Sequence, residues 1–592
     1  MKVKYLFFAG LVSMMAWSCS DDELQGGGND KPTDAKTYME ISINMPAATR
    51  TATPDQGQEE GQEFENHVGS VLVVLVEASK DESGVTEDKI VFAQKVTEGA
   101  GLFNEDGKKK VKIEDVKGLE LDRNTKEKGY TVYAFVNPTA QMTDYYTQAV
   151  KSKKSWKEVR DGAEQANAGT GNAHDFIQSM TFDGYAKLIE RKGQGQVPSE
   201  ADAGHFLMTD TRMNTVTGRT EPASKTISFI KEVSTGKYLL EGSTNVERAV
   251  ARFDYAKAKA DNIYSYDENW KEELYASTTW ADKSLYVQLT HYKVMNVAKQ
   301  FYHLKRVAPN EKVSSEVWSY GGAETKENFV VDSDWKLKLD YLEELKPDIP
   351  DTWATQGIFF DPLNGEKTDA PTSYLPLIGL FDDTDDWQEG MSQATTDLYE
   401  ALCYCTENTI PTKEGQIHPL TTAIVFRAEI GGSMVNNADK GLYRFNRKIY
   451  NKWDEVQKAY NKAYPDAEIN VTGYEELTGD ENLLAAKKLI TYWPKQSDND
   501  TNKKIVCYYS YWNRHNDNGK PTEMGPMEFA VVRNNIYKLK VSKILKLGDP
   551  VDPTNPEGEV FPPDPDESQE ISMEVEVNVL KWAVRVNDIE FD

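Results

Sequence analysis

Two segments, one near each end of the chain, alternate apolar and polar residues in the way that is typical of a strand with one buried face. The first segment, residues 37–45, has an apolar face made of Met39, Ile41, Ile43 and Met45. The second begins at residue 571, after a Pro-, Asp- and Glu-rich stretch at 549–567 that is typical of an extended, solvated linker. Its apolar positions are Ile571, Met573, Val575, Val577 and Val579, followed by Trp582, Val584 and Val586.

The residues between these two segments predict a mainly β protein with some helices. Residues 68–76 are nearly all apolar, as expected of a strand that is covered on both faces. We expect further strands at 130–136, 246–256, 284–294 and 421–428. Helical patterns occur at 152–164, 173–180, 443–464 and 481–489.

Turn signals in the second half favour antiparallel hairpins. The sequence Asp517-Asn518-Gly519 predicts a tight turn between strands at 508–512 and 527–533. Pro138 marks the end of the strand at 130–136, because proline cannot donate a ladder hydrogen bond. The sequence has no repeat of fixed period, which argues against solenoids and propellers.

Length and composition indicate two large soluble domains. A chain of 592 residues is too long for one ordinary core, and 39% hydrophobic residues are enough to build packed cores. The formal net charge of -28 repels phosphate backbones and anionic membranes, so we expect no nucleic-acid partner.

The N-terminus has the pattern of an export signal. Lys2 and Lys4 precede an apolar stretch, residues 6–17, that is too short to span a bilayer. The following Ala-Trp-Ser-Cys at 16–19 is similar to a lipobox, although Trp17 and the absence of Leu three residues before the cysteine depart from the strict pattern. We therefore expect Cys19 to carry lipid, with an ordinary signal peptide and an incidental cysteine as the alternative.

An exposed arginine, Arg50, follows the first alternating strand and precedes a polar, glycine-bearing loop. Proteases prefer such open segments. Cleavage of the Arg50-Thr51 bond would remove residues 37–45 from the first domain and expose an apolar groove with unpaired backbone groups. The C-terminal segment could fill such a groove in another copy, or it could complete a sheet of its own domain.

Residue types that often carry chemistry have structural explanations here. Cys403, Cys405 and Cys507 are odd in number and are expected to be small buried residues rather than a disulfide framework. We expect His515 to cap or hydrogen-bond a turn, and the acidic run at 382–386 to be a solvated loop rather than a Ca²⁺ site. The metal, nucleophile and phosphate-binding motifs of common enzymes are absent from the sequence, so we expect neither an enzyme nor a cofactor.

At this point the chain resembles the shaft subunit of the minor (short) fimbriae of Bacteroidia, which are fimbrillins of the type V pilus class. In the first half the resemblance rests on Tyr-Ala-Phe-Val-Asn-Pro at 133–138, Phe-Leu-Met-Thr at 206–209 and Val-Glu-Arg-Ala-Val-Ala-Arg at 246–252. In the second half it rests on Tyr-Cys-Thr-Glu-Asn-Thr at 404–409 and on the motifs at 511–516 and 527–537.

The resemblance implies two β-sandwich-like, transthyretin-like domains with antiparallel sheets and a C-terminal donor strand. It also implies a precursor lipidated at Cys19, cleavage between Arg50 and Thr51 by an arginine-specific protease, and a donor strand at 571–591. The expected division is a signal peptide at 1–19, a propeptide at 20–50, domains at 51–255 and 256–548, and a linker with donor strand at 549–592.

The implied setting is a surface fimbrium whose precursor is anchored in the outer membrane and whose filament supports adhesion and biofilm formation. Its partners would be further copies of the chain, accessory anchor and tip subunits, and the protease, whereas the sequence does not identify a host or bacterial receptor. Two alternatives stay open: an adhesin at the fimbrial tip, and a monomeric surface lipoprotein that binds glycans through some of its 12 Trp and 30 Tyr.

Overall fold

A computed structural model gives the fold of much of the chain. It describes residues 36–44, 58–60, 63–81, 84–105, 108–114, 116, 119, 128–159, 206–210, 228–234, 237–275, 284–298, 301–309, 319–320, 328–332, 335, 338, 360–361, 375–376, 399–410, 412–418, 420–470, 489–497, 500–520, 523–551 and 572–583. Several predictions fall outside these ranges, namely those on Cys19, Met45, Arg50, Thr51, Ile571, Val584, Val586, the helices at 173–180 and 481–488, and the acidic run at 382–386.

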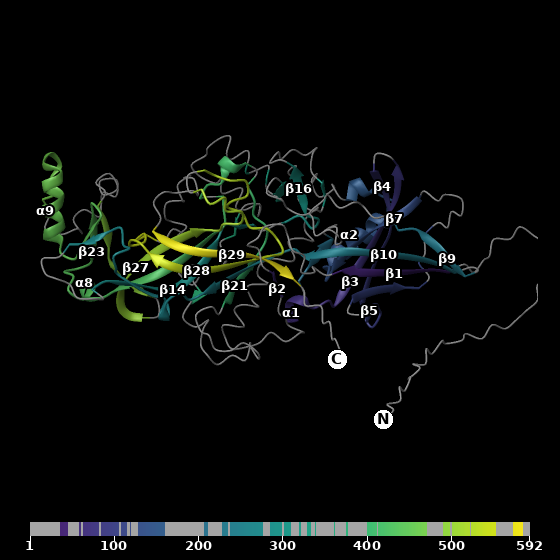
Figure 1. Cartoon of the computed structure of the whole chain (residues 1–592), viewed down its shortest axis with the longest axis horizontal. Helices are drawn as coiled ribbons and strands as arrows, with labels where there is room; N and C mark the ends of the chain where they lie inside the picture. The colour runs from purple at the N-terminus through teal and green to yellow at the C-terminus, as the bar shows by residue number, and fades with distance from the viewer. Residues whose placement is uncertain are drawn as a thin grey trace, which may run out of the picture.

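The first sheet closes into a ring. Its strands follow the order β1-β6-β5-β4-β3-β7-β8-β10-β9, and β1 also pairs with β10. The ring lies at one end of an elongated molecule (Figure 1). The strands are β1 (Lys36–Asn44), β3 (Ser70–Asp81), β4 (Gly84–Glu98), β5 (Gly101–Glu105), β6 (Lys108–Ile113), β7 (Lys128–Val136), β8 (Met208–Asp210), β9 (Ile230–Ser234) and β10 (Lys237–Arg248).

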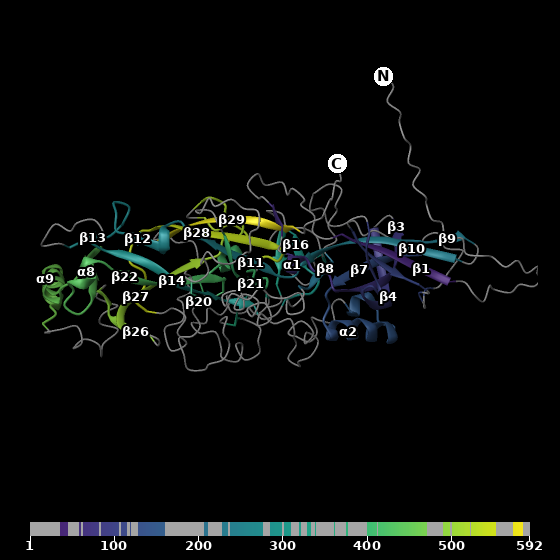
Figure 2. The same cartoon turned by 90° about the horizontal axis from the view of Figure 1, so that it is seen from below.

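Strand β3 explains why residues 68–76 are nearly all apolar. Val71, Val73 and Leu75 face the core inside the ring. The alternate residues, Leu72 and Val74 among them, pack in a second core with α2 (Ala140–Lys151). Figure 2 shows α2 against one side of the ring. The prediction of a strand covered on both faces is confirmed.

Two further sheets, of five and six strands, form the frame of the second half of the molecule. A five-stranded sheet has the order β2 (Gln58–Glu60), β29 (Met573–Ala583), β28 (Asn535–Ile544), β11 (Ala251–Ala256) and β21 (Glu400–Cys405). A six-stranded sheet has the order β12 (Ile263–Ser265), β14 (Tyr286–Met295), β22 (Ala423–Gly431), β27 (Asp500–Trp512) and β26 (Pro494–Ser497), with β20 (Leu375–Pro376) on β14. Side chains of both sheets share one core, which includes Phe253, Tyr537, Val287 and Phe426.

Smaller elements extend this frame. A four-stranded sheet consists of β13 (Glu273–Leu274), β24 (Lys448–Tyr450), β23 (Leu442–Phe445) and β25 (Ile490–Tyr492). Short pairings join β15 (Val297–Ala298) with β19 (Phe360–Asp361), and β16 (Arg306–Pro309) with β17 (Ser319–Tyr320) and β18 (Asn328–Val331). The other elements are α1 (Glu63–Asn66), α8 (Ser433–Asn436), α9 (Trp453–Ala463) and the 3₁₀ turns Ala260–Asn262, Lys413–Gly415 and Pro465–Ala467. The fold is mainly β with few helices, as predicted.

Some sequence-based assignments were wrong in detail. The start of the predicted helix at 443–464 is the hairpin of β23 and β24, because Asn446 and Arg447 take φ values of 49° and 59° that no helix accepts, and α9 begins only at Trp453. The predicted strand at 527–533 is largely irregular, and β27 pairs with β22 and β26 instead. The long helix α2 precedes the helix predicted at 152–164, of which the described part has one turn at 156–159.

The sheets are mixed rather than purely antiparallel. Strand β1 runs parallel to β10, and β11 runs parallel to β28. The pairing changes from the ring to the second set of sheets between Arg248, which ends β10, and Ala251, which begins β11. The domain boundaries expected from the sequence stay predictions.

The three cysteines of the described chain are buried and free, as the sequence predicted. Cys403 and Cys405 lie in the shared core of the second half, and burial raises the pKa of both thiols. Burial also raises the pKa of Cys507 to about 12. We expect these thiols of residues 20–592 to resist a thiol-specific reagent at pH 8 and to react fully in denaturant, because only the exposed thiolate is a nucleophile. Rapid labelling of the native protein, followed by absorbance, would contradict this.

Candidate strand-exchange site

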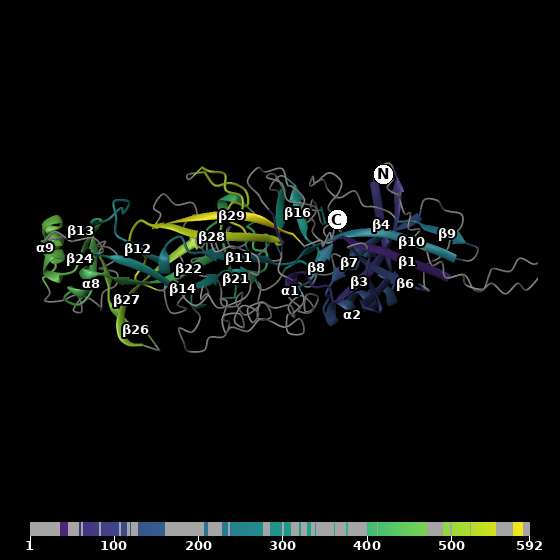
Figure 3. The ribbon, with the colours of Figure 1, turned by 60° about the horizontal axis from the view of Figure 1, so that its bottom comes forward.

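Strand β1 completes the ring by lying between β6 and β10 (Figure 3). It pairs in parallel with β10 along its whole length, from Lys36 opposite Lys237 to Asn44 opposite Asn245. On its other side it pairs antiparallel with β6, where Ile41 lies opposite Val111. Both edges of the backbone of β1 are therefore hydrogen-bonded within one sheet.

The inner face of β1 is buried. Met39, Ile41 and Ile43 have relative exposures of 1%, 0% and 1%. Ile41 lies opposite Gly242, where an added Cβ would stand 3.0 Å from the Ile41 Cδ1 atom. A glycine on β10 thus makes room for the isoleucine of β1, and the strand fills a space that is shaped for it.

The outer face of β1 contributes polar contacts. The Glu40 carboxylate lies 3.3 Å from the Lys110 ammonium of β6, and this contact raises the pKa of Lys110. Glu105 of β5 lies 3.5 Å from the same ammonium group. The Asn44 side chain donates a hydrogen bond of 3.0 Å to the Asn245 side chain of β10. A shift of β1 by one residue would break these polar contacts and would also turn its apolar face outward. The contacts and the apolar face together fix the register of β1.

Loss of β1 would convert this strand position into a groove. The facing edges of β6 and β10 would lose their ladder partners, and the core residues that pack on Met39, Ile41 and Ile43 would be exposed. An apolar groove with two unpaired edges is a template for a strand from elsewhere.

The C-terminal strand β29 lies on its own subunit in this structure. It pairs antiparallel with β28, with Val575 opposite Val541 and Val577 opposite Leu539. Met573 is buried, whereas Val575 and Val577 are only partly buried against the core. The side chains of Val579 and Trp582 are outside the described residues.

The second edge of β29 is covered only at its C-terminal end in the part of the chain that is described. There Gln58–Glu60, strand β2, pairs in parallel with residues 581–583. Strand β2 begins eight residues after Arg50, the predicted cleavage site, and pairs with the C-terminal strand β29. This contact was not predicted, because three polar residues carry no strand signal.

Helix α1 contacts the five-stranded sheet through the Glu65 carboxylate, and the ring through Arg248 of β10. The Glu65 carboxylate is fully buried and accepts hydrogen bonds of 3.0 and 3.1 Å from Arg252 of β11 and one of 2.5 Å from the Tyr404 hydroxyl of β21. Arg252 also forms two bonds of 2.8 Å with Asp254. Burial lowers the pKa of Arg248, which donates to the Glu65 carbonyl, to about 9.

A second buried ion pair lies close to this junction. Arg533 donates bonds of 2.7 and 2.5 Å to the Glu407 carboxylate and one of 2.6 Å to the Tyr302 carbonyl. Burial lowers the pKa of Arg533, but the Glu407 carboxylate outweighs this, so that the pKa lies above its usual value. Lys305 pairs with Glu247 at 2.8 Å.

These contacts explain several of the motifs on which the resemblance rests. Residues of 246–252, 404–409 and 527–537 supply the buried charges between the ring and the second half. Asn137, at φ 53°, accepts from the Gly69 amide at 2.9 Å and donates to the Phe206 carbonyl at 3.0 Å. The motif residues thus contribute to the packing of the two halves.

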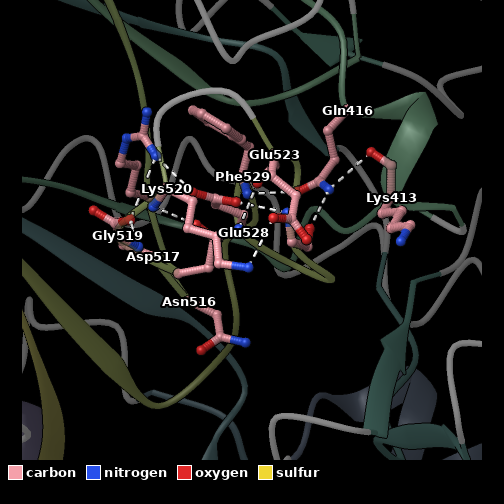
Figure 4. Close-up of polar contacts among 12 residues, drawn as sticks. Lys413, Gln416, Asn516, Asp517, Gly519, Lys520, Glu523, Glu528 and Phe529 are labelled. Carbon is pink, nitrogen blue, oxygen red and sulfur yellow. Dashed lines mark hydrogen bonds and ion pairs between the residues drawn. The ribbon is translucent and has the colours of Figure 1, made fainter.

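The motif at 511–516 leads into a loop that is fixed by its own polar contacts. Glu528 is fully buried and accepts bonds of 2.7 Å from Arg514 and from the Gly525 amide (Figure 4). Gln416 accepts from the Phe529 amide at 2.6 Å and donates to the Gly525 carbonyl at 2.8 Å. His515 is buried and its Nδ1 lies 2.8 Å from the Tyr537 hydroxyl, which confirms a hydrogen-bonding role.

No cluster of metal-ligating side chains occurs among the described residues. Within the same ranges, no helix is long and apolar enough to cross a membrane.

Comparisons with known proteins place the C-terminal part of the chain in a family. Residues 501–588 match the model of the C-terminal region of fimbrillin, the major fimbrial subunit protein type IV. This stretch contains β27, β28 and β29. This part of the chain is thus similar to the C-terminal region of a fimbrial structural protein, as the sequence resemblance led us to expect.

Solved structures of fimbrial proteins show a loose likeness. A fimbrillin of Porphyromonas gingivalis is 10% identical at a TM-score of 0.29, and the match covers 93% of this chain and 98% of that one. A tip fimbrial protein of Porphyromonas gingivalis, solved with a C-terminal truncation, is 9% identical at a TM-score of 0.29, covering 92% and 100%. No curated protein matches the sequence significantly. The likeness to fimbrillin therefore rests on the sequence match at 501–588.

Proposed function

We propose that this chain is the shaft subunit of a bacterial surface fimbria that polymerises by strand exchange. In this proposal the precursor is lipidated at Cys19, anchored in the outer membrane and cleaved between Arg50 and Thr51 by an arginine-specific protease. Cleavage allows β1 to leave the ring. The donor segment at 571–591 of a second copy then enters the groove, and the filament supports adhesion and biofilm formation together with anchor and tip subunits.

The observation that carries this proposal is the position of β1. It is a strand near the N-terminus, it is buried on one face, and it lies between two strands that follow it in sequence. The predicted cleavage site comes only six residues after its last residue, Asn44. A single cut there separates β1 from every other described element of the ring, because each of them follows Arg50 in the sequence.

The energy available for exchange is large. Each fully buried aliphatic side chain contributes roughly 1.5–3 kcal/mol, and a ladder hydrogen bond adds a net of about 0.5–1.5 kcal/mol. An empty groove with the three buried positions of β1 is therefore strongly disfavoured, and an incoming strand that refills it would dissociate slowly. The ordering of the donor offsets part of this gain.

The test begins with purified residues 20–592 and an arginine-specific protease. We expect a new N-terminus at Thr51, loss of residues 20–50 and filaments in negative-stain electron microscopy. The Arg50→Ala variant is the matched control and is expected to stay monomeric. Clean cleavage at Thr51 with monodisperse particles would contradict the shaft role and favour a tip adhesin or a monomeric glycan-binding lipoprotein.

A further inference from the structure

The strand that leaves and a segment of the C-terminal strand have closely related sequences. Residues 39–45 read Met-Glu-Ile-Ser-Ile-Asn-Met, and residues 573–579 read Met-Glu-Val-Glu-Val-Asn-Val. Met, Glu and Asn recur at the same places, and both isoleucines become valine. The correspondence extends to both faces of the strand, so it is closer than a shared apolar alternation.

The residues that recur are those with specific contacts in β1. Met39 is buried in the ring, Glu40 pairs with Lys110, and Asn44 donates to Asn245. These contacts are made by the inner face, the β6 edge and the β10 edge of the position that β1 occupies. A strand with the same residues in the same order could repeat all three.

We propose that residues 573–579 of a second copy replace residues 39–45 in the same direction and register, so that Glu574 pairs with Lys110 and Asn578 with Asn245. This inference rests on the proposed strand exchange and adds which residues enter the groove and what selects them. Lys110 and Asn245 are then the specificity-determining residues of the acceptor.

Charge complementarity supports this register. Ser42 lies opposite Lys110, and Glu40 lies opposite Lys112 on β6. The incoming segment would place Glu576 at the position of Ser42, beside the Glu574 that replaces Glu40. Two carboxylates would then face the two ammonium groups of β6. The other segment with a similar pattern, residues 582–587, would place Arg585 opposite Lys110, where like charges repel.

Residues 573–579 would gain a second neighbouring strand and more burial by moving from their own subunit into the ring of another copy. On its own subunit this segment pairs with β28 alone among the described strands, and Val575 and Val577 are only partly buried. In the ring the same positions would lie between two strands, where Ile41 and Ile43 are fully buried. The contact of Glu574 with Lys543, at 2.7 Å, would be exchanged for the contact with Lys110.

A comparison of the donor segment with β1 explains why β1 has to be removed by cleavage before exchange. The isoleucines of β1 fill the core of the ring more completely than the valines of the donor would. In addition, β1 belongs to the same chain as the groove, so the effective concentration of β1 at the groove is high. The donor therefore cannot displace β1 while residues 36–44 stay attached. Removal of β1 leaves the donor without a competitor.

Disulfide trapping between copies tests the register. We would prepare residues 20–592 with Lys110→Cys and Glu576→Cys, cleave with the arginine-specific protease and oxidise. We expect a ladder of disulfide-linked oligomers on a non-reducing gel, because the two positions lie directly opposite each other. The pair Lys112→Cys and Glu574→Cys is expected to give the same ladder. Each single variant is a control, since the other thiols are buried.

The possible outcomes of the disulfide experiment distinguish a wrong register from a failure of strand exchange. The pair Lys110→Cys and Arg585→Cys tests the competing segment, and a ladder there instead of with Glu576→Cys would overturn the register while leaving strand exchange intact. Filaments with a ladder from neither pair would also overturn it. If cleaved wild-type protein forms no filaments, the proposed function fails.

Charge reversal gives a second readout. Lys110→Glu should slow filament growth of the cleaved protein on the order of tenfold, because it juxtaposes like charges at the joint. Adding Glu574→Lys and Glu576→Lys to the same chain should restore growth, whereas Lys520→Glu, on an exposed loop, should leave it unchanged. Equal growth of all variants by light scattering would contradict the selection of the donor by Lys110.

Discussion

Removal of residues 571–592 is expected to abolish filament formation while cleavage at Arg50 continues. The deletion removes the donor but leaves the ring, β1 and the cleavage segment unchanged. Cleaved protein should therefore remain monomeric in sedimentation velocity and show no filaments in electron microscopy. Filaments from the deleted protein would contradict strand exchange by the C-terminus.

The deletion also changes the second half of the molecule, so a milder variant is needed. Strand β29 covers β28, and Met573 packs in the shared core. Val577→Asp leaves the strand in place but puts a carboxylate at a position that we expect to be buried in the filament, where an unpaired charge is strongly disfavoured. We expect no filaments from this variant and normal growth from the matched Val551→Asp, which changes an exposed valine outside the donor segment.

The stability of the free monomer is the control for both variants. Val577 is only partly buried on its own subunit, so Val577→Asp should lower the free energy of unfolding by no more than about 1–2 kcal/mol. A variant that stays folded by circular dichroism and is cleaved at Arg50, yet does not assemble, identifies a defect of the joint rather than of the fold.

Arg533→Leu is expected to be the most destabilising single substitution of those considered. Arg533 and its partner Glu407 have side-chain exposures of 0% and 1%. Loss of the guanidinium leaves a carboxylate buried without its counter-ion and leaves the Tyr302 carbonyl without the donor at 2.6 Å. Breaking such a buried pair from one side costs about 3–5 kcal/mol, to be measured by urea unfolding.

Two controls separate the buried charge from a general loss of charge. Lys520→Ala removes an exposed pair with Glu523 and should change stability by less than about 1 kcal/mol. The double variant Arg533→Leu with Glu407→Leu removes both charges and should recover a large part of the loss, because no lone ion stays buried. A single variant as stable as the wild type would show that the pair contributes little.

The periodicity of the sequence identified strands more reliably than it identified their partners. The alternation at 37–45 predicted β1 and its inner face, and the apolar run at 68–76 predicted a strand with two buried faces. Both follow from the local rule that side chains alternate across a strand. The same rule could not show that β1 runs parallel to β10, whose residues lie some 200 positions later in the chain.

The wrong assignments at 443–464 and 527–533 also arise because sequence patterns are local. In the segment 443–464, apolar residues at helical spacing predicted a helix where the structure has a two-residue turn at Asn446 and Arg447. This turn forms because β23 pairs with β24 and β25, and the local spacing carries no information about that pairing. Residues 527–533 look like a strand because they are apolar, yet they are buried in a loop that Glu528 and Gln416 hold by side-chain hydrogen bonds.

The sequence by itself determined the strand-rich character of the chain, the buried face of β1, and the burial of Cys403, Cys405 and Cys507. Only the tertiary structure decided that β1 closes a ring, that β2 pairs with the end of β29, and that Glu65 meets Arg252 and Tyr404. Local patterns report which residues avoid water, because that property belongs to each residue. The choice of partner depends on contacts between distant segments and on charges that are stable in the interior only when the whole fold brings them together.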